Sequence, residues 1–132
     1  MEHKTFKDIY AIAERNVKEN PYVREKEADE IIGIYLDWLR GEVEEVRDET
    51  KPRNRIHLAD ELADILWVYA GLLAVLKDRG YIDSVEEVFM QSHEKYTERM
   101  PAFLRSSAEL WESIKARQKE DLALRHQKEY GQ

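Results

Sequence analysis

One stretch of the sequence limits the possible folds more than any other. Residues 65–76 read ILWVYAGLLAVL, a run of 12 residues without a charge. A helix built from them would be apolar on every side, so it should be buried all round. The chain has only 132 residues, and its remaining helical segments are modest. We therefore expect self-association, in which long helical hairpins from two copies form one four-helix core.

The composition favours a single all-α domain. Charged residues make up 37% of the chain, which has only five Gly and three Pro. Ala, Leu, Glu, Lys and Arg are plentiful, and these are strong helix formers. The length suits one ordinary domain. We expect one domain over residues 1–132, with a core at about 20–104 and a C-terminal helix at about 106–130.

Turn and capping signals divide the chain into five expected helices. Pro52 ends the second, because the residue before proline disfavours helix, and Gly80 caps the third. Ser84-x-x-Glu87 is a capping box that starts the fourth helix, and Met100-Pro101 ends it. A second box, Ser106-x-x-Glu109, starts the last. The expected ranges are 5–19, 24–50, 55–79, 84–100 and 106–130.

Four acidic residues flank the turn between the second and third expected helices. Glu42-x-x-Glu45 precedes the turn at residues 51–54, and Glu61-x-x-Asp64 follows it. Residues three apart share one helical face, with about 5 to 6 Å between their Cβ atoms. At the helical rise, the first pair lies roughly 15 and 10 Å before Pro52 and the second roughly 13 and 18 Å after it. An antiparallel hairpin would place the two pairs side by side.

The phase of these acids relative to the apolar residues predicts that they face inward. Glu42 falls between Leu39 and Val46 on the 3.6-residue period, and Glu61 leads into Ile65 and Val68. Inward carboxylates at one level lose hydration, at a cost of several kcal/mol per ion, unless protons or a cation neutralise them. Mg²⁺ or Mn²⁺, which prefer oxygen ligands, would neutralise such a cluster.

Several other classes of site and partner are disfavoured. The chain has no cysteine, which excludes disulfides, thiolate metal sites and thiol nucleophiles. No Glu-x-x-His occurs, which counts against a ferritin-like di-iron site. The net charge of −7 disfavours nonspecific nucleic-acid binding. The N-terminus lacks the apolar region of a secretory signal, and the longest apolar run is short for a membrane span. We expect a soluble cytoplasmic protein with neither nucleic acid nor membrane as partner.

At this point the residues carry a resemblance to a known family. GEVEEV (41–46) and DELADILWV (60–68) resemble the Glu-x-x-Glu and Glu-x-x-Asp halves of the motif of the MazG-like nucleoside triphosphate pyrophosphohydrolases, which are all-α. RGYIDSVEEVFMQSHEKYTERMPAF (79–103) resembles the family's downstream segment, in which a helix carries a Lys and an Arg before a Pro. The resemblance covers about residues 20–104. It departs at Gly41, where many members have another Glu, at His93 and at Met100.

The resemblance implies a Mg²⁺-dependent hydrolysis, with Mn²⁺ possible, of a nucleoside triphosphate or its deoxy form to the monophosphate and pyrophosphate. Lys95 and Arg99 would neutralise the pyrophosphate, and Trp67 would stack on the base. Glu45 is our hypothesis for the catalytic group that orients or deprotonates the attacking water. The implied metal ligands are Glu42, Glu45, Glu61 and Asp64.

Other interpretations stay open. Within the pyrophosphohydrolases, the alternative is a phosphoribosyl-ATP pyrophosphatase, whose Glu-rich helical hairpin is similar to the one expected in this chain. A non-catalytic helical dimerisation module is the alternative from a different class. Its acids would be a solvated face or would pair with arginines. Lys95 and Arg99 would then be ordinary exposed residues, and Trp67 would be core. The partner arginines would be Arg40, Arg47 and Arg55. A homodimer and a homotetramer are both compatible with the sequence, as are several bases and sugars in the substrate.

Overall fold

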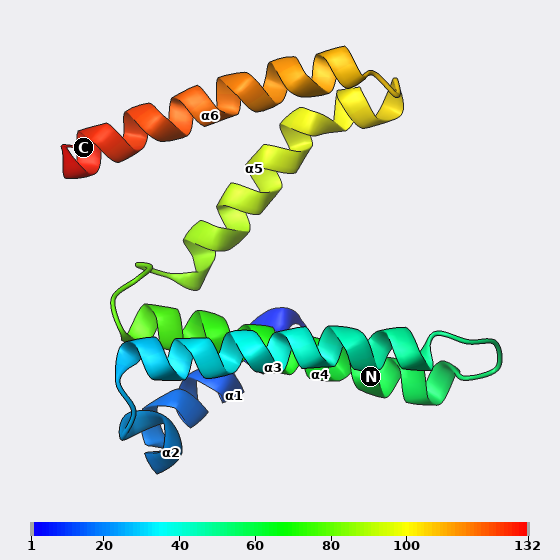
Figure 1. Cartoon of the computed structure of the whole chain (residues 1–132), viewed down its shortest axis with the longest axis vertical. Coiled ribbons are helices and arrows are strands. Elements are labelled where there is room, and N and C mark those ends of the chain that lie inside the picture. The colour runs from blue at the N-terminus through cyan, green and yellow to red at the C-terminus, as the bar shows by residue number, and fades with distance from the viewer. Residues whose placement is uncertain (1, 132) are drawn as a thin grey trace. The chain divides into compact units, whose positions relative to one another are not determined.

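The computed structural model describes residues 2–131, and within that range it contains six helices and no strand (Figure 1). The all-α fold expected from the sequence is confirmed. The chain divides into two compact units, Met1–Val85 and Glu86–Gln132, which we describe separately. Whether they form the single domain expected over 1–132 stays a prediction. The helices are α1 (Phe6–Glu19), α2 (Pro21–Arg24), α3 (Ala28–Glu49), α4 (Arg55–Asp78), α5 (Val85–Leu104) and α6 (Ala108–Tyr130).

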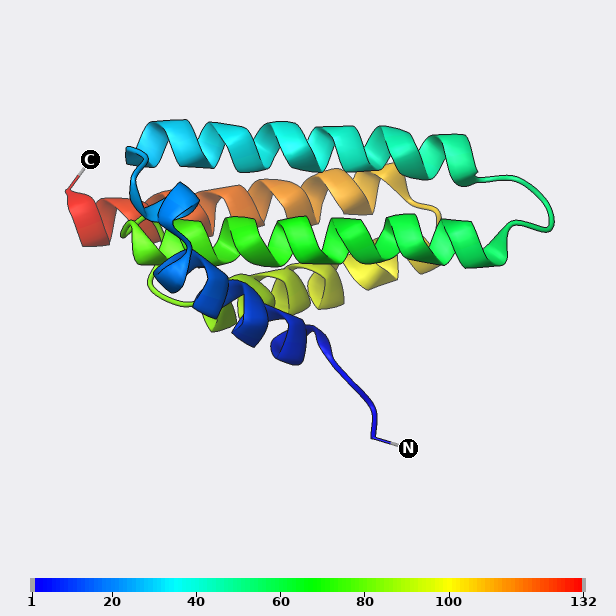
Figure 2. The ribbon, with the colours of Figure 1, turned by 90° about the horizontal axis from the view of Figure 1, so that it is seen from below.

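In the first unit, α3 and α4 form a long antiparallel hairpin, and α1 crosses α4 (Figure 2). Residues 70–75 of α4 are buried on all sides, as expected for an apolar helix. Earlier in the run, however, Leu66 and Trp67 are still 43% and 39% exposed. Within this run, one chain therefore fully buries only Val68 and residues 70–75. Coverage of the first half by a second copy stays a prediction.

Local signals set the ends of the helices in this unit. The backbone N–H of Thr5 donates to the Asp8 carboxylate at 2.8 Å, which closes a capping box at the start of α1. After α4, Gly80 takes a φ of 83°, a conformation that favours glycine. The second expected helix, 24–50, corresponds to α3, which starts four residues later, and the short α2 precedes it. Asn20 caps a short α2 that has Pro21 in its first turn, and α3 begins only at Ala28.

In the second unit, α5 continues through Pro101 to Leu104, so the prediction that Met100-Pro101 ends the helix is wrong. A proline within a helix removes one backbone hydrogen bond and strains the preceding turn. The last turn also carries Phe103. Its ring centroid lies 6.5 Å from that of Tyr96 and 5.0 Å from that of Trp111 on α6. Aromatic contacts of this kind offset part of the cost of the proline.

The start of α6 also differs from the prediction by one residue. Ser107, not Ser106, is the N-cap, and its hydroxyl accepts a hydrogen bond from the Leu110 N–H at 3.1 Å. Ser106 instead takes a φ of 49° in the turn after α5. No residue of α6 is buried. Among residues 2–131, no helix combines the length and apolar character needed to cross a membrane.

Candidate metal centre

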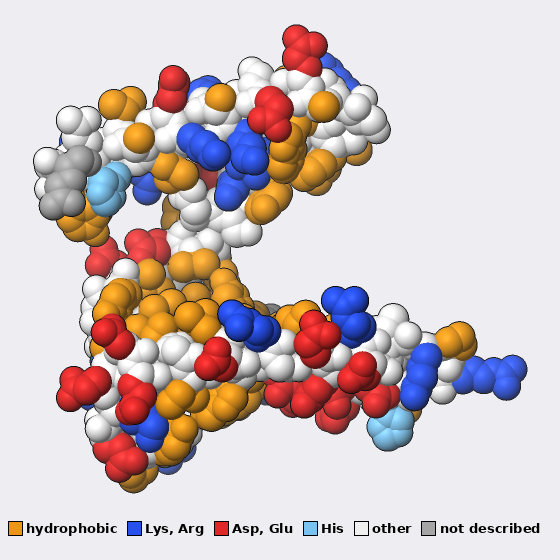
Figure 3. Space-filling view, in the orientation of Figure 1, with side chains coloured by type: hydrophobic (Ala, Val, Ile, Leu, Met, Phe, Trp, Pro, Cys, Tyr) orange, Lys and Arg blue, Asp and Glu red, His pale blue; other side chains and the backbone are white. Residues whose placement is uncertain are grey.

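The α3–α4 hairpin brings together all four acids singled out in the sequence. Glu42 and Glu45 come from α3, and Glu61 and Asp64 come from α4. One carboxylate oxygen from each residue lies within 4.8 Å of the others. Three of the side chains are half-buried, and Glu45 is exposed. Figure 3 shows acidic side chains gathered along one edge of this hairpin.

The packing of the hairpin explains why these positions meet. Tyr35 is buried, and its ring lies so close to Gly71 of α4 that a Cβ there would overlap it. Glu42 follows Tyr35 by seven residues, which is two helical turns, and therefore lies on the same face of α3. On α4, Glu61 precedes the buried Val68 by the same interval. The line of side chains between the two helices thus changes from apolar to acidic towards the turn.

The cluster is electrostatically strained when only the protein is considered. The pKa of Glu61 is raised to about 7, first because its carboxyl group lies within hydrogen-bonding reach of Glu45 and then because of burial. The negative charges of Glu45, Asp64 and Asp60 add to this shift. Burial, followed by the Glu45 carboxylate, also raises the pKa of Glu42. Without a cation, the cluster therefore tends to retain a proton near neutral pH.

No basic side chain relieves this repulsion within the described part of the chain. The Oε2 atoms of Glu42 and Glu61 are buried, and neither has a hydrogen-bond partner among residues 2–131. Arg47, one of the three arginines considered as partners, pairs instead with Glu44 at 3.2 Å. A buried acceptor without a partner costs about 1–3 kcal/mol, and more when it is charged. The interpretation as a structural ion-pair site therefore has no support in this geometry.

The donor set suits a hard divalent cation. It consists entirely of carboxylate oxygens, the ligand type that Mg²⁺ and Mn²⁺ favour. The two buried oxygens without partners would gain a ligand bond. A bound cation would also remove the mutual repulsion that raises the pKa of Glu61. The residues present therefore fit a divalent metal, and their assignment as its ligands stays a prediction.

The other residues proposed from the sequence lie in both units. Trp67 belongs to α4, one turn beyond Asp64, and is 39% exposed. Lys95 and Arg99 belong to α5, in the second unit. Lys95 is half-buried, whereas Arg99 is only 7% exposed. The non-catalytic interpretation assumed that Arg99 is an ordinary exposed residue, and its burial contradicts that assumption. The role of all three in binding substrate stays a prediction.

Three residues to which the sequence analysis gave no role affect the acidic cluster or the environment of Arg99. The negative charge of Asp60 raises the pKa of Glu61. Its place next to Glu61 in the sequence could have indicated this effect. Gln118 and Trp111 of α6 contact Arg99. They lie 19 and 12 residues further along the chain than Arg99, and no periodicity links them to it. Only the folding of α6 back against α5 brings them together.

Comparison with known proteins gives one match. The family model described as the MazG nucleotide pyrophosphohydrolase domain matches residues 33–104. The matched segment includes the four acids together with Lys95 and Arg99, and it ends where α5 ends. No curated protein and no solved structure matches the chain.

Proposed function

Because the chain belongs to the MazG nucleotide pyrophosphohydrolase family, we propose that it hydrolyses a nucleoside triphosphate, ribo or deoxy, to the monophosphate and pyrophosphate. Family membership supports nucleotide pyrophosphohydrolase activity in general. The proposal adds the triphosphate substrate and a dependence on Mg²⁺, for which Mn²⁺ can substitute. The observation that carries it is the cluster of four carboxylates, in which two buried oxygens have no hydrogen-bond partner among the described residues 2–131.

In this proposal, Glu42, Glu61 and Asp64 hold the metal, and Glu45 contributes to the same site. A bound Mg²⁺ would screen the phosphate chain and polarise the phosphorus that is attacked. Glu45 is the exposed member of the cluster and lies within hydrogen-bonding reach of both Glu42 and Glu61. It can therefore orient an incoming water and accept its proton. Trp67 would stack on the base, and Lys95 and Arg99 would balance charge on the leaving pyrophosphate.

We also propose that the active form is a homodimer or homotetramer. Hydrophobic side chains remain exposed at heptad-like spacing along the hairpin, with Leu36 and Val43 on α3 and Leu62 and Leu66 on α4. A second copy that covered these side chains would remove their apolar surface from water. A second hairpin placed on this surface would complete the expected four-helix core. Size-exclusion chromatography with light scattering tests this directly, and a monomer at micromolar concentration would contradict it.

The catalytic proposal is tested by a substrate panel. Canonical and modified nucleoside triphosphates, with phosphoribosyl-ATP included, are scored for pyrophosphate release in Mg²⁺ and in EDTA. We expect release from at least one triphosphate in Mg²⁺ and none in EDTA. Turnover of phosphoribosyl-ATP alone would favour the alternative enzyme, and no turnover of any compound would favour the non-catalytic module.

Point variants then test the residues. Glu45→Gln and Asp64→Asn should each abolish pyrophosphate release while helicity, measured by circular dichroism, is kept. Glu44→Gln is the matched control, because Glu44 neighbours Glu45 on α3 but forms an exposed pair with Arg47. It should retain full activity. Full activity in Glu45→Gln or Asp64→Asn would remove that residue from the mechanism.

A further inference from the structure

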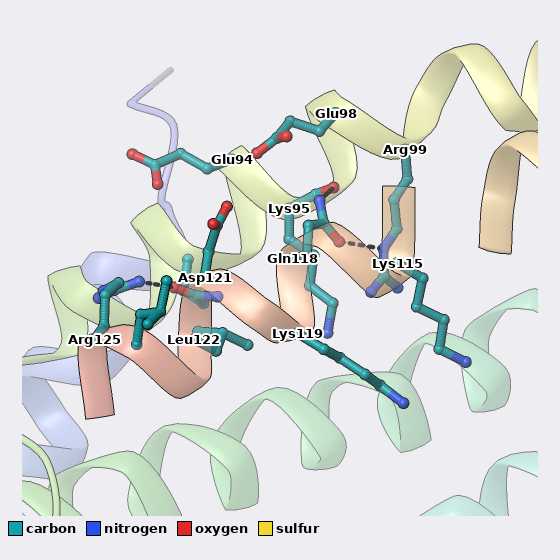
Figure 4. Close-up of a pocket in the computed structure, with 12 residues that line it drawn as sticks. Glu94, Lys95, Glu98, Arg99, Lys115, Gln118, Lys119, Asp121, Leu122 and Arg125 are labelled. Atoms are coloured by element: carbon teal, nitrogen blue, oxygen red, sulfur yellow. Dashed lines mark hydrogen bonds between the residues drawn. The ribbon is translucent and has the colours of Figure 1, made fainter. Parts of the chain in front are cut away.

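A groove of about 610 Å³ lies between α5 and α6, wholly within the second unit (Figure 4). One of its carboxylates, Glu98, is already paired with Arg117, which does not line the groove. The lining therefore carries an excess of positive charge, although the chain as a whole carries a net charge of −7. The charged lining residues are the cations Lys95, Arg99, Lys115, Lys119 and Arg125 and the acids Glu94, Glu98 and Asp121.

Arg99 is the buried cation of this groove. It is only 7% exposed, and arginines buried to this degree are normally paired with a carboxylate. Here its Nε donates to Gln118 Oε1 at 2.8 Å, and the guanidinium carbon lies 4.7 Å from the Trp111 ring centroid and 5.5 Å from that of Tyr96. It has no ion pair among residues 2–131. Its Nη groups therefore remain as donors, held in a rigid fork suited to an oxyanion.

Two lysines of α6 extend this positive charge along the groove. Lys115 and Lys119 are four residues apart and thus lie on one face of the helix. Within the described residues, neither forms an ion pair. Figure 4 shows both side chains projecting from α6 towards one side, and the three carboxylates of the lining lie towards the other. Cations spaced along one side in this way match an extended anion better than a single small one.

We propose that the groove between α5 and α6 binds a phosphate chain, with Arg99, Lys115 and Lys119 as the donors. That the chain is the triphosphate of the substrate or the pyrophosphate product rests on the proposed function. Both lysines lie outside the segment 33–104 that matches the family model. They would be phosphate contacts that the matched segment does not contain, and they would give the exposed α6 a role in binding.

Isothermal titration calorimetry of the full chain with inorganic pyrophosphate, in EDTA and at low ionic strength, tests this proposal without the metal site. Wild type should bind pyrophosphate more tightly than inorganic phosphate, and added salt should weaken the binding. The double variant Lys115→Gln/Lys119→Gln should bind about tenfold more weakly, since exposed charge pairs each contribute up to a few-fold in affinity. Lys128→Gln is the matched control, because Lys128 is on the same helix but does not line this groove.

Two results would overturn the proposal: no binding of pyrophosphate by wild type, or equal affinity in the double variant and wild type. Circular dichroism of the double variant checks that α6 is intact. The assay for triphosphate hydrolysis distinguishes failure of the groove proposal from failure of the proposed enzymatic function. Hydrolysis without metal-free pyrophosphate binding would refute the groove alone. Lysine-dependent binding without hydrolysis of any nucleotide would keep the groove and refute the proposed enzymatic function. A nucleoside monophosphate should not displace pyrophosphate if the phosphate chain is what the groove recognises.

Discussion

Replacing Gly71 with alanine tests whether the hairpin packs as closely as the structure indicates. The added Cβ would overlap Cε1 of the buried Tyr35 ring and would lie 3.1 Å from its Cζ and 3.3 Å from its Cδ1. A ring held in a packed core cannot move away freely, and overpacking of this kind costs about 1–3 kcal/mol. Alanine also gains about 1 kcal/mol over glycine in helix propensity. The net change in the free energy of unfolding is therefore a loss of about 0–2 kcal/mol.

Two further glycines in the same hairpin provide matched controls. At Gly33 and Gly41 of α3 a Cβ would meet no atom within 4 Å. Gly33→Ala and Gly41→Ala therefore gain the propensity without a clash and should each stabilise the protein by about 0.5–1 kcal/mol. Relative to these controls, Gly71→Ala should be less stable by about 1–3 kcal/mol.

The assay is urea unfolding followed by circular dichroism, with the slope m checked for constancy across the four proteins. Thermal unfolding gives a second readout, in which 1 kcal/mol corresponds to about 3–5 °C for a chain of this size. If Gly71→Ala were as stabilising as Gly33→Ala and Gly41→Ala, the close approach of Tyr35 to α4 would be refuted. The argument that this packing places Glu42 opposite α4 would then also fail.

Three further outcomes are expected. In EDTA, Glu61 with its pKa near 7, against an ordinary 4.5, binds more protons in the folded state than in the unfolded state between these values. The free energy of unfolding should therefore fall as pH rises from 4.5 to 7, and Glu61→Gln should flatten this dependence in urea titrations; identical profiles would contradict it. Millimolar Mg²⁺ should raise the melting temperature, because a metal concentration of 100 times Kd adds about 2.7 kcal/mol to the free energy of unfolding. Asp64→Asn should abolish this shift in melting temperature. Ser107→Ala should destabilise the protein by about 1 kcal/mol in urea unfolding, whereas Ser106→Ala should cost less, because only Ser107 caps α6.

The hairpin and its acids could be predicted because the information is local and periodic. The apolar stripes set the inward faces of the two helices, and the distances of Glu42, Glu45, Glu61 and Asp64 from Pro52 set their level along the hairpin. Both depend only on helical geometry, which the sequence pattern reports directly. The structure accordingly holds the four carboxylates together.

The remaining features depend on contacts between segments that no local pattern encodes. The continuation of α5 through Pro101 is accompanied by packing of Phe103 against Trp111, a residue of the next helix. Arg99 resembles any exposed helical cation in the sequence, and its burial appears only once Gln118 and Trp111 lie against it. The capping box that starts at Ser106 satisfied the local rule, yet the turn places Ser107 at the cap.

The central claim is that the carboxylates of the α3–α4 hairpin form a divalent metal site. A crystal structure of the protein soaked in Mn²⁺, with anomalous diffraction recorded near the manganese edge, tests it most directly. We expect an anomalous peak coordinated by carboxylate oxygens from both helices, with Glu61 Oε2 or Glu42 Oε2 among the ligands. A fully occupied peak elsewhere, or no peak with the four acids bridged by arginines or water, would contradict the claim.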